Sequence, residues 1–289
     1  MADLGAEDIF TPKEGYGQEC GYPLAPGRGM HPIRLDENRV LKEKCVDSGE
    51  RQAMELIARA TTIPVPKVFD ARYVEREGDK FFYIVMEYIP GKPLNVAWNG
   101  LSESQRKHTC LEIDGYLAQL RKLTGDRIMA ADGGALDVGL YQRRYLGPYD
   151  TEQEFHHALG KGEHHNLGND HTIHFAHADL APRNIIVDDT GHINAIVDWE
   201  RAGWYPEYWD IVRMYYDFPL KHEMKDYTQF WRSLFTRTYE DECNAMIDLV
   251  RRTIPPYPDG VRAERRPDVS DSYYSHAEEL RKTLVTKFG

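Results

Sequence analysis

Three polar residues between positions 174 and 210 have the types and spacing needed to hold a metal ion and to receive a proton from a hydroxyl group. Asp179 and Asn184 follow the pattern D-x-x-x-x-N, and Asp198 comes fourteen residues after Asn184, at the end of an apolar run. Amide and carboxylate oxygens are hard ligands that suit Mg²⁺, and a further carboxylate close by could accept the proton. These residues therefore favour a metal-assisted reaction at a hydroxyl group.

The residues between Asn184 and Asp198 predict a β-hairpin that would bring the two together. A β-branched run follows Asn184, and the turn residues 188–191 include Gly191, which can adopt a positive φ. A second run with alternating apolar residues leads to Asp198. Because the two open ends of a hairpin lie together in space, we expect Asn184 and Asp198 to emerge side by side, with Asp179 on the loop leading in.

The order of these residues is that of kinases, in which an Asp, an Asn five positions on and a second Asp after a hairpin form the site. The longer text HADLAPRNIIVDD…AIVDWERAGWYPEYWD closely resembles the aminoglycoside phosphotransferase family, including its fungal members. The family pattern has Gly where this chain has Ala178, another small residue, so we expect little consequence. Trp199 and Glu200 replace the Phe-Gly of protein kinases, which favours a small-molecule kinase. The structural alternative is a buried hairpin with solvated acids at its turn.

The resemblance implies an α+β, protein-kinase-like fold of two lobes. Residues 1–90 would form the N-terminal lobe, with a small antiparallel sheet, one helix and the nucleotide-binding strands. Residues 91–289 would form a mostly helical C-terminal lobe that carries the catalytic loop and the acceptor site. The similarity covers about residues 29–250 and is strongest over residues 172–212.

Local patterns predict the elements of these lobes. Apolar periodicity indicates a helix over 48–60, with Ala53, Met54, Leu56, Ile57 and Ala60 on its buried face. Strands are expected over 68–75 and 81–89, and capping boxes at Ser102 and Thr151 predict helices over 102–123 and 151–159. Later core residues are expected at Phe230, Trp231, Leu234 and Phe235, followed by a terminal helix over 275–288. Residues 1–28 are a glycine-rich lead-in whose spacing fits no phosphate-binding loop.

The resemblance places Lys42 on a strand, against the phosphates of ATP. Lys44 lies two positions further on and would point to the same face of the strand, so it is the competing lysine. Glu50 would be the ion-pair partner of Lys42, with Glu55 as the alternative. An acidic residue in the first turn of a helix also interacts favourably with the helix dipole, which is the purely structural interpretation of Glu50.

The end of the second predicted strand resembles the hinge between the lobes of a kinase. Backbone groups of Glu87, Tyr88 and Ile89 would then hydrogen-bond adenine, and Met86 would line the adenine slot. Methionine in a strand also commonly fills the core, which is the second interpretation of Met86.

Seven histidines lie close together in the chain: His156, His157, His164, His165, His171, His174 and His177. A zinc site is not favoured there, because the segment has no H-x-x-x-H pair and no cysteine. We instead expect a solvated, histidine-rich loop. His177 is the exception, since in the kinase-like fold such a residue braces the catalytic loop by hydrogen bonds. Asp210 would either anchor the same loop, which is favoured, or sit in the acceptor pocket.

Composition limits the classes of partner and the location of the protein. The 289 residues carry a net charge of −11, which argues against a nucleic-acid binder and fits a cationic or neutral small substrate. With 41% hydrophobic residues, the chain can form a globular core. No signal peptide or membrane span is visible, so we expect a cytoplasmic protein of undetermined oligomeric state. Reduced thiols are expected at Cys20, Cys45, Cys110 and Cys243.

The predicted reaction moves the γ-phosphoryl group of ATP to a hydroxyl group of a small molecule. Asp179 would orient the hydroxyl and accept its proton as catalytic base, while Asn184 and Asp198 would bind Mg²⁺. Relatives resemble kinases of choline, sugars, amino acids and antibiotics, so the acceptor stays open. The alternatives are a nucleotide-binding pseudokinase and a kinase-fold enzyme that uses ATP for a different transfer reaction.

Overall fold

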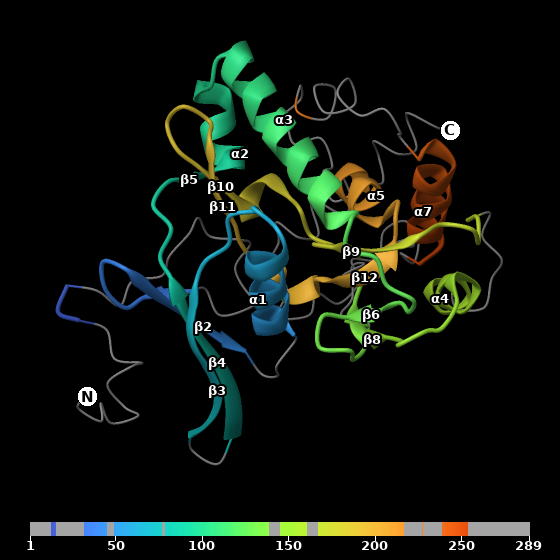
Figure 1. Cartoon of the computed structure of the whole chain (residues 1–289), viewed down its shortest axis with the longest axis horizontal. Coiled ribbons are helices and arrows are strands. Elements are labelled where there is room, and N and C mark those ends of the chain that lie inside the picture. The colour runs from blue at the N-terminus through green and yellow to red at the C-terminus, as the bar shows by residue number, and fades with distance from the viewer. Residues whose placement is uncertain are drawn as a thin grey trace, which may run out of the picture.

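A four-stranded antiparallel sheet and one helix form the N-terminal lobe of a two-lobe α+β fold (Figure 1). The computed structural model of the chain describes residues 13–15, 32–44, 49–76, 79–138, 145–160, 167–216, 227 and 239–253. The sheet has the order β1-β2-β4-β3, and its strands are β1 (Ile33–Arg34), β2 (Arg39–Lys44), β3 (Val68–Arg76) and β4 (Asp79–Glu87). Helix α1 (Glu50–Ala60) connects β2 to β3.

Helix α1 packs its apolar face into the largest core of the molecule. Ala53, Met54 and Ile57 are fully buried and share this core with residues of β2 and β4. Ala60, which the periodicity placed on the same face, is exposed because it lies in the last turn of the helix. The helix begins after Gly49, whose φ of 77° turns the chain sharply into its first turn.

In the described residues after β4, helical residues outnumber strand residues, and three small sheets lie between the helices (Figure 1). The helices are α2 (Leu94–Ala97), α3 (Glu103–Leu120), α4 (Glu152–Leu159), α5 (Trp209–Tyr216) and α7 (Glu240–Thr253). The 3₁₀ turns are η1 (Trp98–Gly100), η2 (Pro182–Asn184) and η3 (Trp199–Arg201). The strands are β5 (Lys92–Pro93), β6 (Met129–Ala130), β7 (Leu136–Asp137), β8 (Tyr145–Leu146), β9 (Ile173–Ala176), β10 (Ile185–Val187), β11 (Ile193–Ile196) and β12 (Gly203–Pro206).

The two predicted capping boxes are present and start α3 and α4. Ser102 Oγ accepts a hydrogen bond from the Gln105 N–H, and Gln105 Oε1 accepts one from the Ser102 N–H at 2.8 Å. Helix α3 ends at Leu120, three residues before the predicted end. The N–H groups of Lys122 and Leu123 donate to carbonyls only three positions back, so the chain leaves the helix through tighter turns.

Strand β4 spans Asp79–Glu87, so it starts and ends two residues earlier than predicted. The N–H of Tyr88 donates to the carbonyl oxygen of Asn38 at 2.7 Å, which draws this segment toward the β1–β2 turn. Pro90 has no N–H and cannot extend the ladder. The sheet therefore stops just where the chain crosses to the other lobe.

Two sheets position the stretch from 174 to 210. Hairpin β10–β11 forms one of them together with β5, and β12 lies between β6 and β9 in the other. The second sheet was not predicted from the sequence, although it aligns the segment before Asp179 with the segment after Asp198. A second core of aromatic and aliphatic residues from α4, α5, α7 and β12 supports it.

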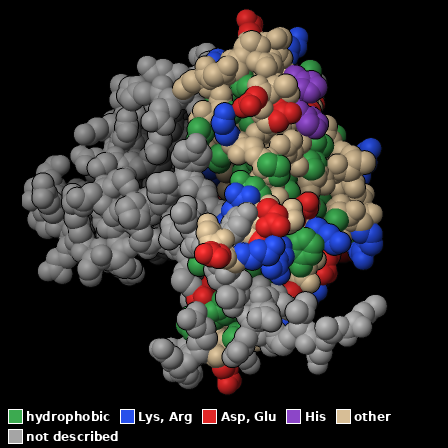
Figure 2. All heavy atoms as spheres, turned by 90° about the vertical axis from the view of Figure 1, so that its left-hand side faces the viewer, with side chains coloured by type: hydrophobic (Ala, Val, Ile, Leu, Met, Phe, Trp, Pro, Cys, Tyr) green, Lys and Arg blue, Asp and Glu red, His purple; other side chains and the backbone are tan. Residues whose placement is uncertain are grey.

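Several predictions concern residues outside the described part of the chain. These are most of the lead-in over 1–28, the helix start at Ser48, the turn at 77–78, His164 and His165, Cys20 and Cys45, the core residues Phe230, Trp231, Leu234 and Phe235, and the helix over 275–288. Cys110 is buried, Cys243 is partly buried, and both carry thiol groups outside any disulfide. Within the described ranges, every helix is too short or too polar to cross a membrane. On the face shown in Figure 2, acidic and basic side chains are interspersed.

Candidate active site

Asn184 and Asp198 lie at the two open ends of the β10–β11 hairpin, as predicted. In the ladder Ile185 is opposite Ile196, and the N–H of Val197 donates to the carbonyl oxygen of Asn184 at 2.9 Å. Two side chains fourteen positions apart in the sequence thus leave the hairpin at the same end. The hairpin itself is held by its apolar residues, which belong to the same core as helix α1.

Asp179 is buried and held by two arginines. One guanidinium nitrogen of Arg183 donates to both carboxylate oxygens, at 2.6 and 2.7 Å, and Arg201 lies 3.2 Å from Oδ2. Asn184 Nδ2 donates to the backbone carbonyl oxygen of Asp179 at 2.8 Å. Burial by itself raises the pKa of the Asp179 carboxyl, but Arg183 and Arg201 outweigh it and hold this pKa below its ordinary value. Asp179 is therefore ionised at neutral pH.

Asp210 anchors the loop that carries Asp179, which confirms the favoured interpretation. Its two carboxylate oxygens accept hydrogen bonds from the N–H groups of His177, at 3.0 Å, and Ala178, at 2.7 Å. The ring of His177 lies between the Asp179 N–H and the carbonyl oxygen of Val197, at 3.2 and 3.1 Å. His177 thus ties the loop to the end of the hairpin, as expected.

Two residues of the site other than glycine have a left-handed backbone. The φ of Ala178 is 62° and that of Asp198 is 67°. This conformation brings Cβ too close to the following carbonyl oxygen, at a cost of about 1–2 kcal/mol for an ordinary residue. The expectation about Ala178 rested on its small size, whereas its positive φ is a backbone conformation that favours glycine at this position.

Five charged side chains form a network between the sheet and the hairpin. Lys42 Nζ lies 3.0 Å from Glu50 Oε1, contacts Asp198 Oδ1, and is 3.8 Å from Glu200 Oε2. Lys44 points to the same face of β2 and pairs with Glu50 at 2.5 Å and Glu200 at 3.0 Å. Both lysine side chains are mostly buried, and Glu50 is almost completely buried. The two lysines that compete in the sequence are thus both in the cluster, but Lys42 is the one that reaches Asp198.

The charges of this network keep Lys42, Asp198 and Glu200 ionised. Burial favours the neutral forms, yet Lys42 lowers the pKa of the Asp198 carboxyl to about 2. The neighbouring charge of Asp198 raises the pKa of Glu200, but Lys42 and Lys44 together bring it below its ordinary value. The carboxylates in turn hold the pKa of Lys42 above its ordinary value in spite of burial. The cluster is therefore a set of largely buried ions, two positive and three negative, in which each charge lies against an opposite one.

Four other candidate residues of the N-terminal lobe each have contacts of their own in the structure, namely Glu55, Met86, Glu87 and Tyr88. Glu55 is exposed and pairs with Arg51 at 3.1 Å, away from the lysine cluster. Met86 is buried in the core that α1 and β4 share. The N–H groups of Glu87 and Tyr88 donate to backbone carbonyls within the same lobe, so they are engaged by the protein itself.

The prediction of a solvated, histidine-rich loop is wrong for His156 and His171, whereas His157 is exposed as expected. His171 is buried between two carboxylates, with Nδ1 2.7 Å from Glu152 and Nε2 2.9 Å from Glu242. His156 is buried as well, and its Nε2 lies 2.8 Å from the Tyr208 hydroxyl. Their polar partners come from helices α4 and α7 and from the turn before α5, which a sequence pattern confined to this segment does not contain.

Sequence reasoning missed Arg183, Arg201 and Glu200 as members of the site. The sequence offered one local signal, which is that Arg183 follows Asp179 closely in the chain and Arg201 follows Asp198 closely. The residues fit a Mg²⁺ ion by the chemistry of their donors. Oxygen atoms of Glu50, Asp198 and Glu200 lie within 4.8 Å of one another, and such hard donors suit Mg²⁺.

Comparisons with solved structures identify proteins of the same fold. A thermostable mutant of aminoglycoside phosphotransferase APH(4)-Ia, in a ternary complex with ADP and hygromycin B, superposes with a TM-score of 0.61, at 12% identity over 95% of each chain. The GDP complex of aminoglycoside 2'-phosphotransferase-IIIa gives a TM-score of 0.58, at 12% identity over 94% of this chain and 93% of the other. At this identity the likeness establishes the fold, which is kinase-like as predicted.

A search of curated protein sequences finds no match. The family model described as "Phosphotransferase enzyme family" matches residues 45–243, more than half of the chain, and the motif-bearing hairpin lies inside that range. The chain therefore belongs to the phosphotransferase enzyme family, the aminoglycoside phosphotransferase family expected from its sequence.

Proposed function

We propose that this protein moves the γ-phosphoryl group of ATP to a hydroxyl group of a small molecule. The observation that carries the proposal is the convergence of Asp179, Asn184 and Asp198 at the open ends of one hairpin, in a chain of this family. Phosphoryl transfer needs mainly positioning and charge neutralisation. A buried carboxylate beside two oxygen ligands provides both.

Asn184 and Asp198 are the proposed ligands of Mg²⁺, which would draw negative charge from the phosphate oxygens when bound. The amide nitrogen of Asn184 donates to the Asp179 carbonyl, so Oδ1 is the atom available to a metal. The low pKa of Asp198 supports its role, because a ligand that is already ionised loses no proton on binding a metal.

Lys42, steadied by Glu50, is the proposed contact for the phosphates. Its pairing with Asp198 places it between the sheet and the proposed metal ligands. Lys44 shares Glu50 and Glu200 with it and would serve as a second positive charge in the same cluster. Adenine would bind at the segment after Met86, using the carbonyl oxygens of Glu87 to Ile89 and the N–H of Ile89, and we place the lobe boundary at residues 90 and 91.

Asp179 is the proposed catalytic base, and its environment defines how it would act. A carboxyl group with a lowered pKa is a weak base, so it would orient the hydroxyl and receive its proton late in the transfer. Arg183 and Arg201 contact the same carboxylate oxygens. An acceptor hydroxyl would therefore take the place of one arginine contact when it binds.

The acceptor is proposed only as a class, a small hydroxylated molecule. Two of the similar aminoglycoside phosphotransferases have solved structures in complex with hygromycin B and with kanamycin. The net charge of −11 on this chain fits a cationic or neutral acceptor. Choline, sugars, amino acids and antibiotics all carry a suitable hydroxyl or a positive charge, and they define the screen.

Calorimetric titration with Mg²⁺-ATP tests the nucleotide half of the proposal. The wild type should bind in a Mg²⁺-dependent manner, and Asp198→Ala should weaken binding at least about tenfold. Asp189→Ala is the matched control, since Asp189 lies on the turn of the same hairpin with its side chain 89% exposed. Equal affinity in the wild type and Asp198→Ala would reject the metal assignment.

A screen of hydroxylated metabolites for acceptor-dependent release of ADP tests the transfer. Asp179→Asn should retain Mg²⁺-ATP binding and lose roughly 10²- to 10⁴-fold in turnover with any acceptor found. A variant that binds nucleotide and turns over normally would remove Asp179 from the mechanism. Release of a product other than ADP would instead indicate a different use of ATP.

A further inference from the structure

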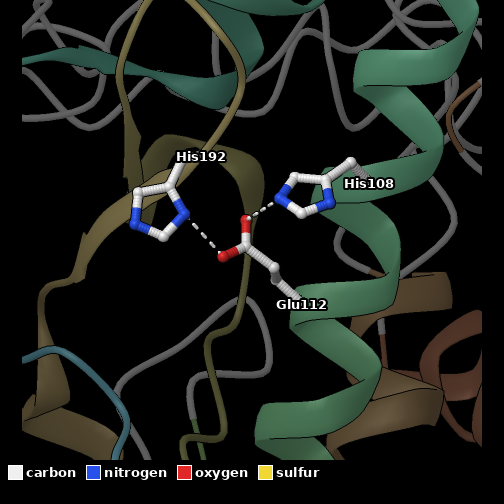
Figure 3. Close-up of side chains that lie close together, drawn as sticks. All are labelled: His108, Glu112 and His192. Carbon is white, nitrogen blue, oxygen red and sulfur yellow. Dashed lines mark ion pairs between the residues drawn. The ribbon is translucent and has the colours of Figure 1, made fainter.

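A second cluster of potential metal ligands lies where helix α3 meets the turn of the β10–β11 hairpin. His108 and Glu112 are one helical turn apart on α3, and His192 comes from the hairpin (Figure 3). His192 Nδ1 lies 2.7 Å from Glu112 Oε1, and His108 Nε2 lies 3.6 Å from Glu112 Oε2. The two imidazoles converge on one carboxylate from opposite elements.

The position of His192 is fixed by contacts on both of its sides. The hydroxyl of Thr109 donates to the carbonyl oxygen of Gly191 at 2.6 Å, in a buried contact. The N–H of Ile193 donates to Glu112 Oε2 at 3.2 Å. A Cβ on Gly191 would lie only 2.8 Å from the Thr109 hydroxyl, so the hairpin turn is seated closely on α3. His192 therefore meets α3 in a defined place rather than on a loose loop.

The donor types and spacing fit a tetrahedral transition-metal ion. Zn²⁺ binds imidazole nitrogen and carboxylate oxygen at about 2.1 Å, which puts two ligand atoms of one tetrahedral ion about 3.4 Å apart. The three donor atoms lie within 4.8 Å of one another, and the 3.6 Å separation is close to that spacing. The 2.7 Å contact between His192 and Glu112 is a hydrogen-bond distance, so a bound ion would replace this hydrogen bond and move the two atoms slightly apart. Glu112 Oε2 also accepts the Ile193 N–H, which is the kind of supporting hydrogen bond that orients a metal-bound carboxylate.

We propose that His108, Glu112 and His192 form a Zn²⁺ site at the surface of the protein, with water completing the coordination. Both histidine side chains are more than half exposed, so an ion and its water can reach them. Exposed histidine side chains also lie close together on the face shown in Figure 2. The pattern is H-x-x-x-E on one helix plus a histidine about eighty residues away, which explains why local sequence patterns did not reveal it.

This site differs in chemistry from the candidate active site. The cluster of Glu50, Asp198 and Glu200 offers only oxygen donors, whereas this one offers two imidazoles. Imidazole ligands favour Zn²⁺ and related ions over Mg²⁺. The proposal does not depend on the phosphotransferase reaction. Its consequence is mechanical, because a bound ion would tie the hairpin turn to α3, and the other end of that hairpin carries Asn184 and Asp198.

Zinc titration of the full-length, chelator-treated protein in excess Mg²⁺ tests the proposal. The variants are His108→Ala, His192→Ala and the double variant, and His157→Ala, an exposed histidine on α4, is the matched control. The wild type and His157→Ala should bind about one more equivalent of Zn²⁺ than either site variant. The double variant should lose no more than either single one. Zinc bound elsewhere on the chain cancels in this comparison.

Two independent readouts accompany the titration. Co²⁺ should give visible absorption bands of imidazole coordination in the wild type that are lost in each site variant. Zn²⁺ should raise the melting temperature of the wild type but not of the site variants, since an ion that binds only the folded state stabilises it. Equal Zn²⁺ binding by wild type and variants, or dependence on only one histidine, would overturn the proposal and leave the trio as a surface ion-pair network.

Discussion

Replacement of Asp210 should destabilise the protein strongly, because this residue satisfies two buried backbone donors. Its carboxylate accepts the N–H groups of His177 and Ala178, and all three residues are buried. In Asp210→Ala both donors would lose their acceptor. An unsatisfied buried donor costs about 1–3 kcal/mol, which gives about 2–6 kcal/mol for the pair.

A second effect of opposite sign reduces this sum. Burial raises the pKa of the Asp210 carboxyl, although the charge of His177 and the two backbone donors oppose this shift. The folded state therefore carries a desolvation cost for the ionised side chain, and Asp210→Ala removes this cost. We therefore expect a net loss of about 3 kcal/mol in the free energy of unfolding for Asp210→Ala at neutral pH. Asp210→Asn keeps one acceptor oxygen and should lose about 1–2 kcal/mol.

Urea unfolding followed by tryptophan fluorescence measures the effect, with the m-value compared between variants to ensure that the same transition is observed. Asp189→Ala, an exposed aspartate paired with Lys92, should change stability by less than about 1 kcal/mol. If Asp210→Ala behaves like this control, the loop donors find other acceptors and the anchoring role of Asp210 is wrong.

Three further perturbations test other parts of the fold. The carboxylates beside His171 raise the pKa of its imidazole in spite of burial, and burial raises the pKa of the Glu152 carboxyl. Because a raised pKa in the folded state stabilises the protein most at low pH, the melting temperature of the wild type should fall from about pH 6.5 upward. The fall should be smaller in His171→Gln. Gly203→Ala would drive a methyl group into the backbone of strand β6 and should cost about 3 kcal/mol or more in urea unfolding, whereas Gly115→Ala on the open face of α3 should stabilise by about 0.5–1 kcal/mol. Ala178→Gly relieves the strain of a left-handed backbone but increases the conformational entropy of the unfolded chain, so the free energy of unfolding should stay within about 0.5 kcal/mol of wild type. A gain above about 1 kcal/mol would show that the backbone strain at Ala178 is larger than stated.

The parts of the site that the sequence predicted are those connected by short-range geometry. Asn184 and Asp198 were expected together because a hairpin brings its ends together whatever surrounds it. The capping boxes of α3 and α4 were equally local. Lys42 and Lys44 were correctly placed on one face of a strand, since side chains two positions apart share a face. In each case a pattern within about fifteen residues contains the whole reason.

The parts that escaped prediction depend on contacts between distant elements. Glu200 joins the lysines of β2 only because the two lobes meet at the hairpin. The chain has 36 lysines and arginines, and nothing local distinguishes Arg183 and Arg201 as the pair that holds Asp179. Likewise, the burial of His171 requires Glu242 from α7, seventy-one residues later. Such tertiary partners are set by packing and cannot be read from spacing.

The ion pair between Lys42 and Asp198 couples the binding of a cation to the binding of an anion. A cation that coordinates Asp198 must compete with the ammonium group of Lys42, and an anion that binds Lys42 must compete with the carboxylate of Asp198. Each ligand therefore releases the protein group that the other requires. By thermodynamic reciprocity, a metal ion and a phosphate will strengthen each other's binding by the same factor, even before they touch. If Asp198 holds the metal and Lys42 the phosphates, as proposed, the site should respond to the metal–nucleotide complex more steeply than to either component alone.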